Sequence, residues 1–313
     1  MRILFTGASS FTGAWFVREL AAAGHEVTAT FRQPAGAYPD PLRRRRVALA
    51  AAAAARAEHG LAFGDDRFLA LLAEGRFDLL CHHAAEVTNY RSPDFDALGA
   101  AARNAHRLPA VLEALARGGG RRVLLTGSVF EGGEGAGSDG LPDFSPYGLS
   151  KALTARLFQF HCRRAGLSLG KLVIPNPFGP WEEARYVAHL VTSWLAGRTP
   201  ACQTPAYVRD NVHVSLLAKA YARFAAGLPA EPGFTRLAPS GYVESQGAFT
   251  LRVAEAMRPR LGLPCPVELR EQADFPEPRV RINTDPPDAR ALGWSEAAAW
   301  DELAAWYREQ AGR

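Results

Sequence analysis

The chain has 313 residues, 48% of them hydrophobic, so it is long and apolar enough to bury a core, and disorder is not expected. Its 36 basic and 32 acidic residues leave a formal net charge of +4, and no basic stripe interleaved with aromatic residues accompanies it. These features argue against a dedicated nucleic-acid-binding protein. The run Arg43 to Arg46 is expected to be a solvated face.

The four cysteines lie far apart, with no C-x-x-C pair and no histidine at ligand spacing, so buried thiols are expected and a metal site is not. The N-terminus meets Gly7 after a short apolar run, which is too short for the core of a signal peptide. No apolar stretch is long enough to cross a bilayer. We therefore expect a cytoplasmic protein.

Short apolar runs alternate with longer helical patterns in the first half of the chain. This alternation predicts an α/β fold with a Rossmann-type doubly wound parallel sheet. Buried strands are predicted at residues 3–5, 26–31, 77–81 and 122–125. Helices are predicted at residues 13–23 and, over an alanine-rich stretch that should face solvent, at residues 48–57.

The alternation becomes irregular and prolines cluster after about residue 175. We therefore expect an NAD(P)-binding Rossmann domain over residues 1–175 and a smaller substrate-binding lobe over residues 176–313, with the chain free to cross back between them. Apolar residues at helical spacing over residues 300–308 predict a helix docked on the core.

The segment T-G-A-S-S-F-T-G at residues 6–13 connects the first strand to a helix, where backbone N–H groups can bind a dinucleotide pyrophosphate. Gly7 would make the tight turn, and Gly13 would permit close helix packing. Ser10 replaces the middle glycine of the usual fingerprint, so its side chain either crowds the pyrophosphate or donates a hydrogen bond to it. The expected cofactor contacts of this loop are Gly7, Ser9, Ser10, Phe11 and Gly13.

Arg32 follows the second strand, at the position where an acidic residue binds the ribose of NAD and an arginine accommodates the 2′-phosphate of NADP. The sequence therefore favours NADP over NAD. The alternative is that Arg32 is a solvated residue at the end of the strand.

Tyr147 and Lys151 are four residues apart, so on a helix they share a face. A free phenol has a pKa of about 10, and acid/base work near neutral pH needs a preference of about 4 kcal/mol for the phenolate. A neighbouring ammonium and an oxidised nicotinamide supply that preference. Lys151 can also hold the nicotinamide ribose. This spacing is common on helix surfaces, and its place in a dinucleotide fold is what makes it a candidate catalytic pair.

Two hydroxyls, Thr126 and Ser128, follow the strand at residues 122–125. Ligands of open α/β sheets bind at the carboxyl ends of the strands, so either hydroxyl is a candidate to bind the substrate carbonyl oxygen. Hydroxyls in such loops also commonly satisfy only the backbone of a turn.

Taken together, these motifs resemble the extended short-chain dehydrogenases/reductases of the NAD-dependent epimerase/dehydratase family, in the branch that modifies nucleotide sugars. The resemblance covers nearly the whole chain. Its motifs are Thr6-Gly7 to Gly13, Gly64-Asp65, Asp78 with His82-His83-Ala84-Ala85, Asn104, Tyr147 with Lys151, Pro175 to Pro180, Arg209-Asp210 and Leu292-Gly293-Trp294.

The resemblance implies roles for further cofactor residues. Asp65 would contact the adenine, Ala84 and Ala85 would line the cofactor, and Asn104 would support the catalytic helix beside it. Counted back from a Val-Phe pair that resembles the family's Val-Tyr, Thr126 is favoured as the substrate-oxygen ligand, with Ser128 as the alternative.

The resemblance also implies a substrate site. Asn176 and Arg209 match positions that hold the diphosphate of the substrate, a role that suits a forked guanidinium. The alternatives are an asparagine that caps a turn and an arginine in a surface ion pair with Asp210. A homodimer paired through the helices around Asn104 and Tyr147 is expected from the same resemblance.

One departure limits the chemistry. The family's sugar 4,6-dehydratases carry an Asp-Glu pair after the catalytic threonine, whereas Gly127-Ser128 stand here, so that dehydration is not expected. His82 and His83 lack acidic or cysteine partners and are expected to pack against the cofactor.

The leading hypothesis is NADP-dependent reduction of a 4-keto nucleoside-diphosphate sugar with Tyr147 as the acid/base group. The alternatives are a 4-epimerase with retained NAD, a reductase of non-sugar carbonyls, and a non-catalytic NADP sensor.

Overall fold

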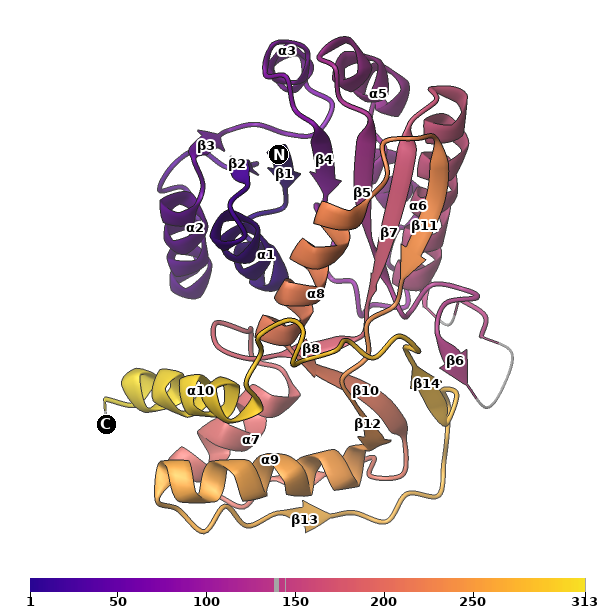
Figure 1. Ribbon diagram of the computed structural model, residues 1–313. Coiled ribbons are helices and arrows are strands. Elements are labelled where there is room, and N and C mark those ends of the chain that lie inside the picture. The colour runs from indigo at the N-terminus through magenta and orange to yellow at the C-terminus, as the bar shows by residue number, and fades with distance from the viewer. Residues whose placement is uncertain (138–140, 144, 313) are drawn as a thin grey trace. The chain divides into compact units, whose positions relative to one another are not determined.

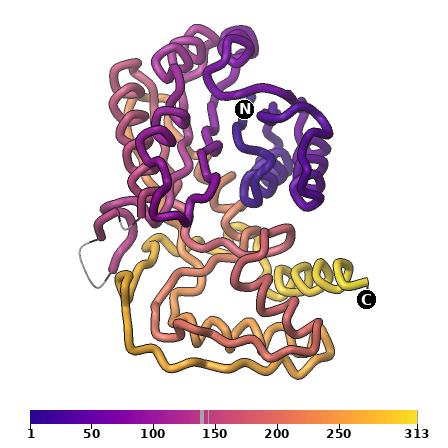
Figure 2. The backbone as a smooth tube through the Cα atoms, turned by 180° about the vertical axis from the view of Figure 1, so that it is seen from behind, coloured from indigo at the N-terminus to yellow at the C-terminus, as the bar shows by residue number. Residues whose placement is uncertain are grey.

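The computed structural model describes residues 1–137, 141–143 and 145–312. The chain forms two compact units, each assembled from separate segments. Unit 1 contains Met1–Glu134, Pro142–Ile174 and Ala218–Ala238, and unit 2 contains Gly135–Leu141, Pro175–Leu217 and Pro239–Arg313. A single boundary between residues 175 and 176 does not separate the units, because residues 218–238 return to unit 1 (Figure 2).

Unit 1 is built on a seven-stranded sheet in which all neighbouring strands are parallel (Figure 1). The strands, in their order across the sheet, are β3 (Arg56–His59), β2 (Glu26–Phe31), β1 (Arg2–Thr6), β4 (Leu79–His82), β5 (Arg122–Ser128), β7 (Ser168–Ile174) and β11 (Gly233–Leu237). The order reverses direction between β1 and β4. Doubly wound sheets bind dinucleotides in the crevice at this switch point.

Helices cover both faces of this sheet. They are α1 (Phe11–Ala22), α2 (Pro41–Ala53), α3 (Asp66–Glu74), α4 (Ala97–Asn104), α5 (Leu108–Arg117), α6 (Pro146–Arg164) and the part of α8 (Val214–Gly227) from Ala218 onward. Leu4 of β1 packs in the core cluster with α3, α5 and α6, whereas the next residue, Phe5, faces Tyr221 of α8. Successive side chains of a strand point to opposite faces, so β1 is apolar on both.

The predicted strands are confirmed, with β4 beginning two residues later than expected and β5 extending three residues further. The predicted helix over residues 48–57 is wrong at its end: α2 stops at Ala53, and residues 56–59 pair with β2. Pairing with an open strand edge therefore overrides the helix propensity of alanine. The solvated face expected for the arginine run is also wrong for Arg46, which is 1% exposed.

Unit 2 contains a sheet of β12 (Tyr242–Ser245), β10 (Val208–His213), β14 (Val280–Ile282) and β6 (Ala136–Gly137), with β8 (Asn176–Phe178) paired to β10. A second sheet pairs β13 (Glu268–Leu269) with β9 (Ala201–Cys202). Its helices are α7 (Tyr186–Leu195), α9 (Gln246–Leu261) and α10 (Glu296–Gln310). The C-terminal helix expected around residues 300–308 is confirmed as α10, which buries Trp300, Leu303 and Trp306.

All four cysteines are buried free thiols, as predicted: Cys81, Cys162, Cys202 and Cys265. Across the described residues, the helices are too short or too polar to traverse a bilayer.

Candidate active site

The phosphate loop leads from β1 into α1 at the carboxyl edge of the sheet. Gly7 has φ of 81°, in the left-handed region, and a Cβ there would lie 2.7 Å from the nitrogen of Ala84. A Cβ on Gly13 would lie 2.2 Å from the carbonyl oxygen of Gly7. Both positions therefore require glycine, and the loop leads directly into the N-terminus of α1, the kind of position that favours an anion.

The side chain of Ser10 satisfies the loop itself. Its Oγ donates to the carbonyl of Gly7 at 3.0 Å and accepts from the nitrogen of Gly13 at 3.0 Å, and it also contacts His83 Nε2 at 3.0 Å. Ser10 is thus the N-cap of α1. Of the loop's other expected contacts, Ser9 and Phe11 are buried.

Two arginines follow β2 in the sequence, and one of them contacts the loop. Arg32 follows β2, and its exposed side chain lies 3.9 Å from Glu86. Arg43, near the start of α2, donates to Ser9 Oγ at 3.2 Å and lies over the ring of Tyr38 at 5.3 Å. The approach of Arg43 to the loop had no signal in the sequence beyond the arginine run itself.

Further expected cofactor residues follow β3 and β4. Asp65, the N-cap residue of α3, is exposed and accepts from the nitrogen of Ala62 at 3.3 Å. Ala84 and Ala85 follow β4 and are half-buried, and the nitrogen of Ala84 donates to Thr6 at 3.2 Å. These residues therefore lie at the edge where the phosphate loop begins.

Asn104, at the end of α4, connects the segment after β4 to the helix that carries the candidate pair. Its Oδ1 accepts from the nitrogen of Glu86 at 2.7 Å, and its Nδ2 donates to Thr154 Oγ1 of α6 at 3.3 Å. These bonds are consistent with support of the catalytic helix.

Tyr147 and Lys151 lie in the first turns of α6, which begins with the Ser145 cap and Pro146. The half-buried ring of Tyr147 packs beside Tyr90, with 5.3 Å between ring centroids. Lys151 is buried, and its Nζ donates to the carbonyl of Thr126 at 2.6 Å. The helix thus brings Lys151 to the end of β5.

The charge of Lys151 depends on its surroundings. Burial lowers the pKa of Lys151 to about 8, Glu131 opposes this shift, and Lys171 adds to it. The ammonium is therefore still the dominant form at neutral pH, but it gives up its proton more readily than the ammonium of a solvated lysine.

The two candidate hydroxyls have different partners. Ser128 Oγ accepts from the nitrogen of Phe130 at 3.2 Å, which is a bond within the turn after β5. Thr126 Oγ1 lies 3.0 Å from His83 Nδ1. Both hydroxyls are buried among the strand ends, but only the contact of Thr126 leads toward the phosphate loop.

His82 does not lie against a cofactor site, which corrects the expectation. It is 1% exposed, stacks on Phe158 with ring centroids 5.1 Å apart, and donates from Nε2 to the carbonyl of Asn104 at 3.0 Å. Its Nδ1 lies 3.0 Å from Thr6 Oγ1, which also accepts two backbone N–H groups, so the proton of that hydroxyl points to Nδ1. Burial lowers the pKa of His82 to about 3.

A buried chain of charges lies directly beyond β5. Lys171 of β7 contacts the carboxylates of both Glu131 and Glu134, and Glu134 in turn accepts from Arg236 Nε of β11 at 2.7 Å. Glu131 Oε1 also accepts from the nitrogen of Ser128 at 2.7 Å. We refer to these four side chains as the Lys171 network. No local pattern predicts this network, since its members come from three separate segments.

Gly127 belongs to the same arrangement. A Cβ at Gly127 would lie 2.5 Å from Cε of Lys171 and 2.9 Å from Glu131 Oε1. The absence of a side chain at this position therefore makes room for the Lys171 network.

The expected substrate residues lie on adjacent strands of unit 2. Asn176 of β8 donates from Nδ2 to the carbonyl of Asp210 at 3.0 Å. Arg209 of β10 pairs with Glu277 at 2.9 Å and lies 4.1 Å over the ring of Tyr207. The ion pair suggested with Asp210 is wrong, because the Asp210 carboxylate accepts backbone bonds at Gly241 and Asn283.

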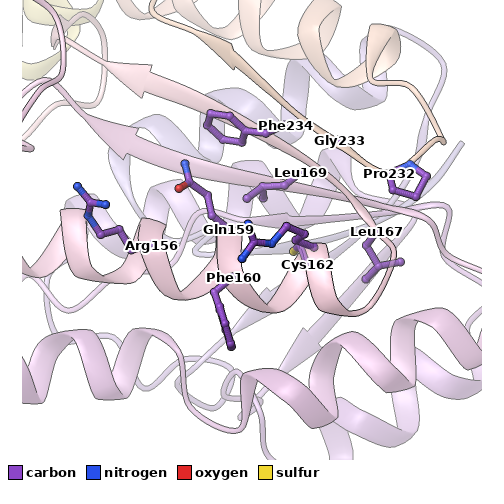
Figure 3. A pocket seen from close by; sticks show the side chains of 10 residues that line it. Arg156, Gln159, Phe160, Cys162, Leu167, Leu169, Pro232, Gly233 and Phe234 are labelled. Atoms are coloured by element: carbon purple, nitrogen blue, oxygen red, sulfur yellow. The ribbon is translucent and has the colours of Figure 1, made fainter.

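No group of metal-ligating side chains occurs among the described residues. A cavity of about 490 Å³ lies on unit 1, lined by the second half of α6 and the starts of β7 and β11 (Figure 3). Its wall includes Leu169, Gly233 and Phe234, so it lies near the amino ends of these strands, opposite the edge that carries Thr126. Burial raises the pKa of Cys162 in this wall to about 12, which leaves it an inert thiol.

A doubly wound parallel sheet with a glycine-rich phosphate loop and a Tyr-x-x-x-Lys pair on α6 defines an extended short-chain dehydrogenase/reductase fold. The chain belongs to the NAD dependent epimerase/dehydratase family, whose model matches residues 3–233. No curated protein sequence matches the chain.

Solved structures of similar fold cover nearly the whole chain. MoeE5 in complex with UDP-glucose and NAD is 21% identical, with 99% of each chain covered and a TM-score of 0.72. The dTDP-glucose 4,6-dehydratase DesIV from Streptomyces venezuelae is 24% identical, with 100% of this chain and 98% of that chain covered and a TM-score of 0.71. The UDP-glucose-4-epimerase from Stenotrophomonas maltophila is 19% identical, with 100% and 99% covered and a TM-score of 0.75.

Proposed function

We propose that the protein is an NADP-dependent reductase of a 4-keto nucleoside-diphosphate sugar, with Tyr147 as its acid/base group. The observation that carries the cofactor choice is the basic surrounding of Ser9. Arg43 donates to this residue of the phosphate loop, Arg32 follows β2, and residues 32–39 contain no carboxylate. An arginine at this place suits a 2′-phosphate, whereas NAD-binding proteins carry an acid there.

The residues of unit 1 fit a dinucleotide. Gly7 and Gly13 leave space that a Cβ would fill, and the start of α1 provides N–H groups for a pyrophosphate. Asp65 is exposed where an adenine would lie, and Ala84 and Ala85 would line the cofactor. When bound, the nicotinamide supplies the hydride chemistry.

The side chains of α6 and β5 would handle the proton. Tyr147 would donate its phenolic proton to the substrate oxygen during reduction. The buried Lys151 ammonium, four residues further along α6, would stabilise the phenolate that remains and hold the nicotinamide ribose. Thr126 is the hydroxyl that would contact the substrate oxygen, since Ser128 is used by its turn.

The Lys171 network supports the exclusion of 4,6-dehydration. Where the dehydratases of the family place an acidic pair, this chain has Gly127 and Ser128. The nearest carboxylate that follows, Glu131, is buried against Lys171 and the nitrogen of Ser128. A carboxylate held in this way is not free to remove a substrate proton.

The nucleoside diphosphate is proposed to bind Asn176 and Arg209. Arg209 already occupies a fixed position, because three backbone carbonyls and Glu277 accept from its guanidinium. A diphosphate would replace the half-exposed Glu277 as its anionic partner. Solved structures of similar fold are complexes with UDP-glucose and UDP-glucuronic acid, which belong to the substrate class that we propose.

The cofactor assignment is tested by binding. We expect NADPH to bind more tightly than NADH, and Arg32→Ala and Arg43→Ala each to weaken NADPH binding by about tenfold while NADH binding stays unchanged. Arg117→Ala, which removes an exposed charge at the end of α5, is the matched control. Equal losses for both cofactors would contradict the 2′-phosphate assignment.

A 4-epimerase with retained NAD is the second candidate, because the family includes epimerases and a UDP-glucose-4-epimerase shares the fold. Mass spectrometry of the nucleotide that co-purifies separates the two. Tightly retained NAD, with no oxidation of added NADPH by 4-keto sugar nucleotides, would favour the epimerase. In either case Tyr147→Phe should abolish turnover and spare cofactor binding.

A further inference from the structure

His83 lies at the end of β4, between the phosphate loop and the end of β5. Its Nε2 is 3.0 Å from Ser10 Oγ and 3.1 Å from Thr12 Oγ1, and its Nδ1 is 3.0 Å from Thr126 Oγ1. One imidazole ring therefore joins the loop proposed to bind the cofactor to the hydroxyl proposed to contact the substrate.

The ring is neutral under ordinary conditions. Phe5 and Phe16 enclose it, with ring centroids 5.7 and 5.2 Å away. Burial lowers the pKa of His83 to about 3, and the charges of Lys151 and His82 act in the same direction. A neutral imidazole has one N–H donor and one acceptor nitrogen, so its two contacts must differ in direction.

The bonds of Ser10 indicate which nitrogen carries the proton. In the arrangement that we infer, Ser10 donates its single hydroxyl proton to the carbonyl of Gly7, and the hydroxyl oxygens of Ser10 and Thr12 both lie within reach of a proton on Nε2. The contact between Ser10 Oγ and His83 Nε2 is therefore a hydrogen bond only if Nε2 donates. With the proton on Nε2, Nδ1 is an acceptor, and the Thr126 hydroxyl donates to it. His82 has the same tautomer, by the independent bonds of Thr6.

We propose that His83 is a positioning residue that takes the hydroxyl proton of Thr126, so that Thr126 acts as a hydrogen-bond acceptor toward the hydroxyl oxygen of the alcohol form at the reacting carbon. The identity of that oxygen, at the reacting carbon of a nucleotide sugar, rests on the proposed function. The backbone of Thr126 is fixed as well, because Lys151 Nζ donates to its carbonyl. Thr126 is thus held at both its carbonyl and its side chain.

This arrangement discriminates between the two forms of the substrate. An alcohol can donate its proton to the lone pairs of Thr126, whereas a ketone has no proton to donate. The alcohol form is therefore bound more tightly than the ketone form, and protonated Tyr147 is left as the donor to the ketone. Without His83, the Thr126 hydroxyl would keep the buried Tyr221 as a neighbour and would be able to turn and donate to the ketone.

The tautomer is tested on the full-length protein without substrate. Long-range ¹H–¹⁵N spectra of protein labelled at histidine resolve the two ring nitrogens, and His83→Gln identifies the signals of His83 among the eight histidines. We expect a protonated Nε2 and an unprotonated Nδ1, with the Nδ1 signal moving toward that of a free acceptor in Thr126→Val. A proton on Nδ1, or an Nδ1 signal unmoved by Thr126→Val, would overturn the proposal.

The discrimination is tested by binding of a nucleoside-diphosphate hexose and of its 4-keto form. In His83→Leu the affinity for the ketone relative to the alcohol should rise by about tenfold, which is the typical contribution of one hydrogen bond. His83→Gln keeps a carbonyl acceptor and an amide donor and should restore most of the original ratio. His189→Leu, on the exposed face of α7, is the matched control.

The two experiments fail in different ways. If neither sugar nucleotide binds wild-type protein, the proposed function is wrong, while the spectra still decide the direction of the Thr126 hydroxyl. If both bind and the ratio is unchanged in His83→Leu, the positioning role is wrong and the proposed function stands.

Discussion

Replacement of Lys171 by methionine provides the sharpest test of the buried charges beyond β5. Methionine keeps most of the volume of the lysine stem but removes the ammonium that contacts Glu131 and Glu134. Glu134 retains Arg236, whereas Glu131 is 1% exposed and retains the nitrogen of Ser128. Both carboxylates thus lose the Lys171 ammonium, and Glu134 keeps the guanidinium of Arg236 as an ionic partner.

Breaking a buried ion pair from one side costs about 3 to 5 kcal/mol. The charge of Lys151 acts on Glu131 and partly compensates, so the lower end of this range, about 3 kcal/mol, is expected. Lys219→Met is a matched control, because Lys219 pairs with Glu19 at 3.0 Å while both side chains keep about a quarter of their exposure. Breaking that partly exposed pair should cost about 0 to 1 kcal/mol.

Urea unfolding, followed by circular dichroism and tryptophan fluorescence, measures both losses. A second substitution, at Glu131, should change stability in opposite directions in the wild-type protein and in Lys171→Met. Glu131→Gln should destabilise the wild-type protein but stabilise Lys171→Met, because it removes the charge that the first substitution left behind. The reasoning is refuted if Lys171→Met costs no more than Lys219→Met, or if Glu131→Gln makes Lys171→Met less stable.

Three further outcomes are expected. Burial raises the pKa of Glu182 from 4.5 to about 8, so the folded protein keeps a proton that the unfolded chain loses, and stability should fall as pH rises through that interval. Glu182→Gln should remove this fall and gain more than about 1.4 kcal/mol at pH 8, measured by urea unfolding, while a parallel fall in both proteins would contradict it. Gly7→Ala should weaken NADPH binding at least about tenfold, whereas Gly24→Ala, with φ of 82° but open space around it, should not. Equal NADPH binding by both variants would refute the role of the close packing between Gly7 and Ala84. The proposed homodimer through α4 and α6 should become monomeric in light scattering when the exposed Leu98 and Leu157 are both replaced by aspartate, and a wild-type monomer would end that proposal.

The elements that the sequence predicted are those with a strong local pattern. The strand β1 contains a continuous apolar run, β2 alternates apolar residues with β-branched threonines, and α10 places its tryptophans at helical spacing. The strand β3 was missed because R-A-E-H is short and polar and follows a run of alanines, so its identity comes from pairing with β2.

The candidate site was predictable to a similar degree. The glycines of the loop and the pair on α6 carry motifs. The partners of Thr126 and Lys171 do not, because these contacts join residues about 40 positions apart and more, and no local pattern encodes them. The position of Arg43 beside Ser9 likewise follows from the packing of α2 on α1.

The return of residues 218–238 to unit 1 has a consequence for synthesis on the ribosome. Until β11 emerges, β7 is an open apolar edge, and Glu134 lacks Arg236, which is made 102 residues later. More than forty residues of unit 2 are therefore synthesised while β7 of unit 1 is still unpaired on one side. During this interval, edge-to-edge association with other chains competes with folding. A fragment ending at residue 175 would be arrested in that state.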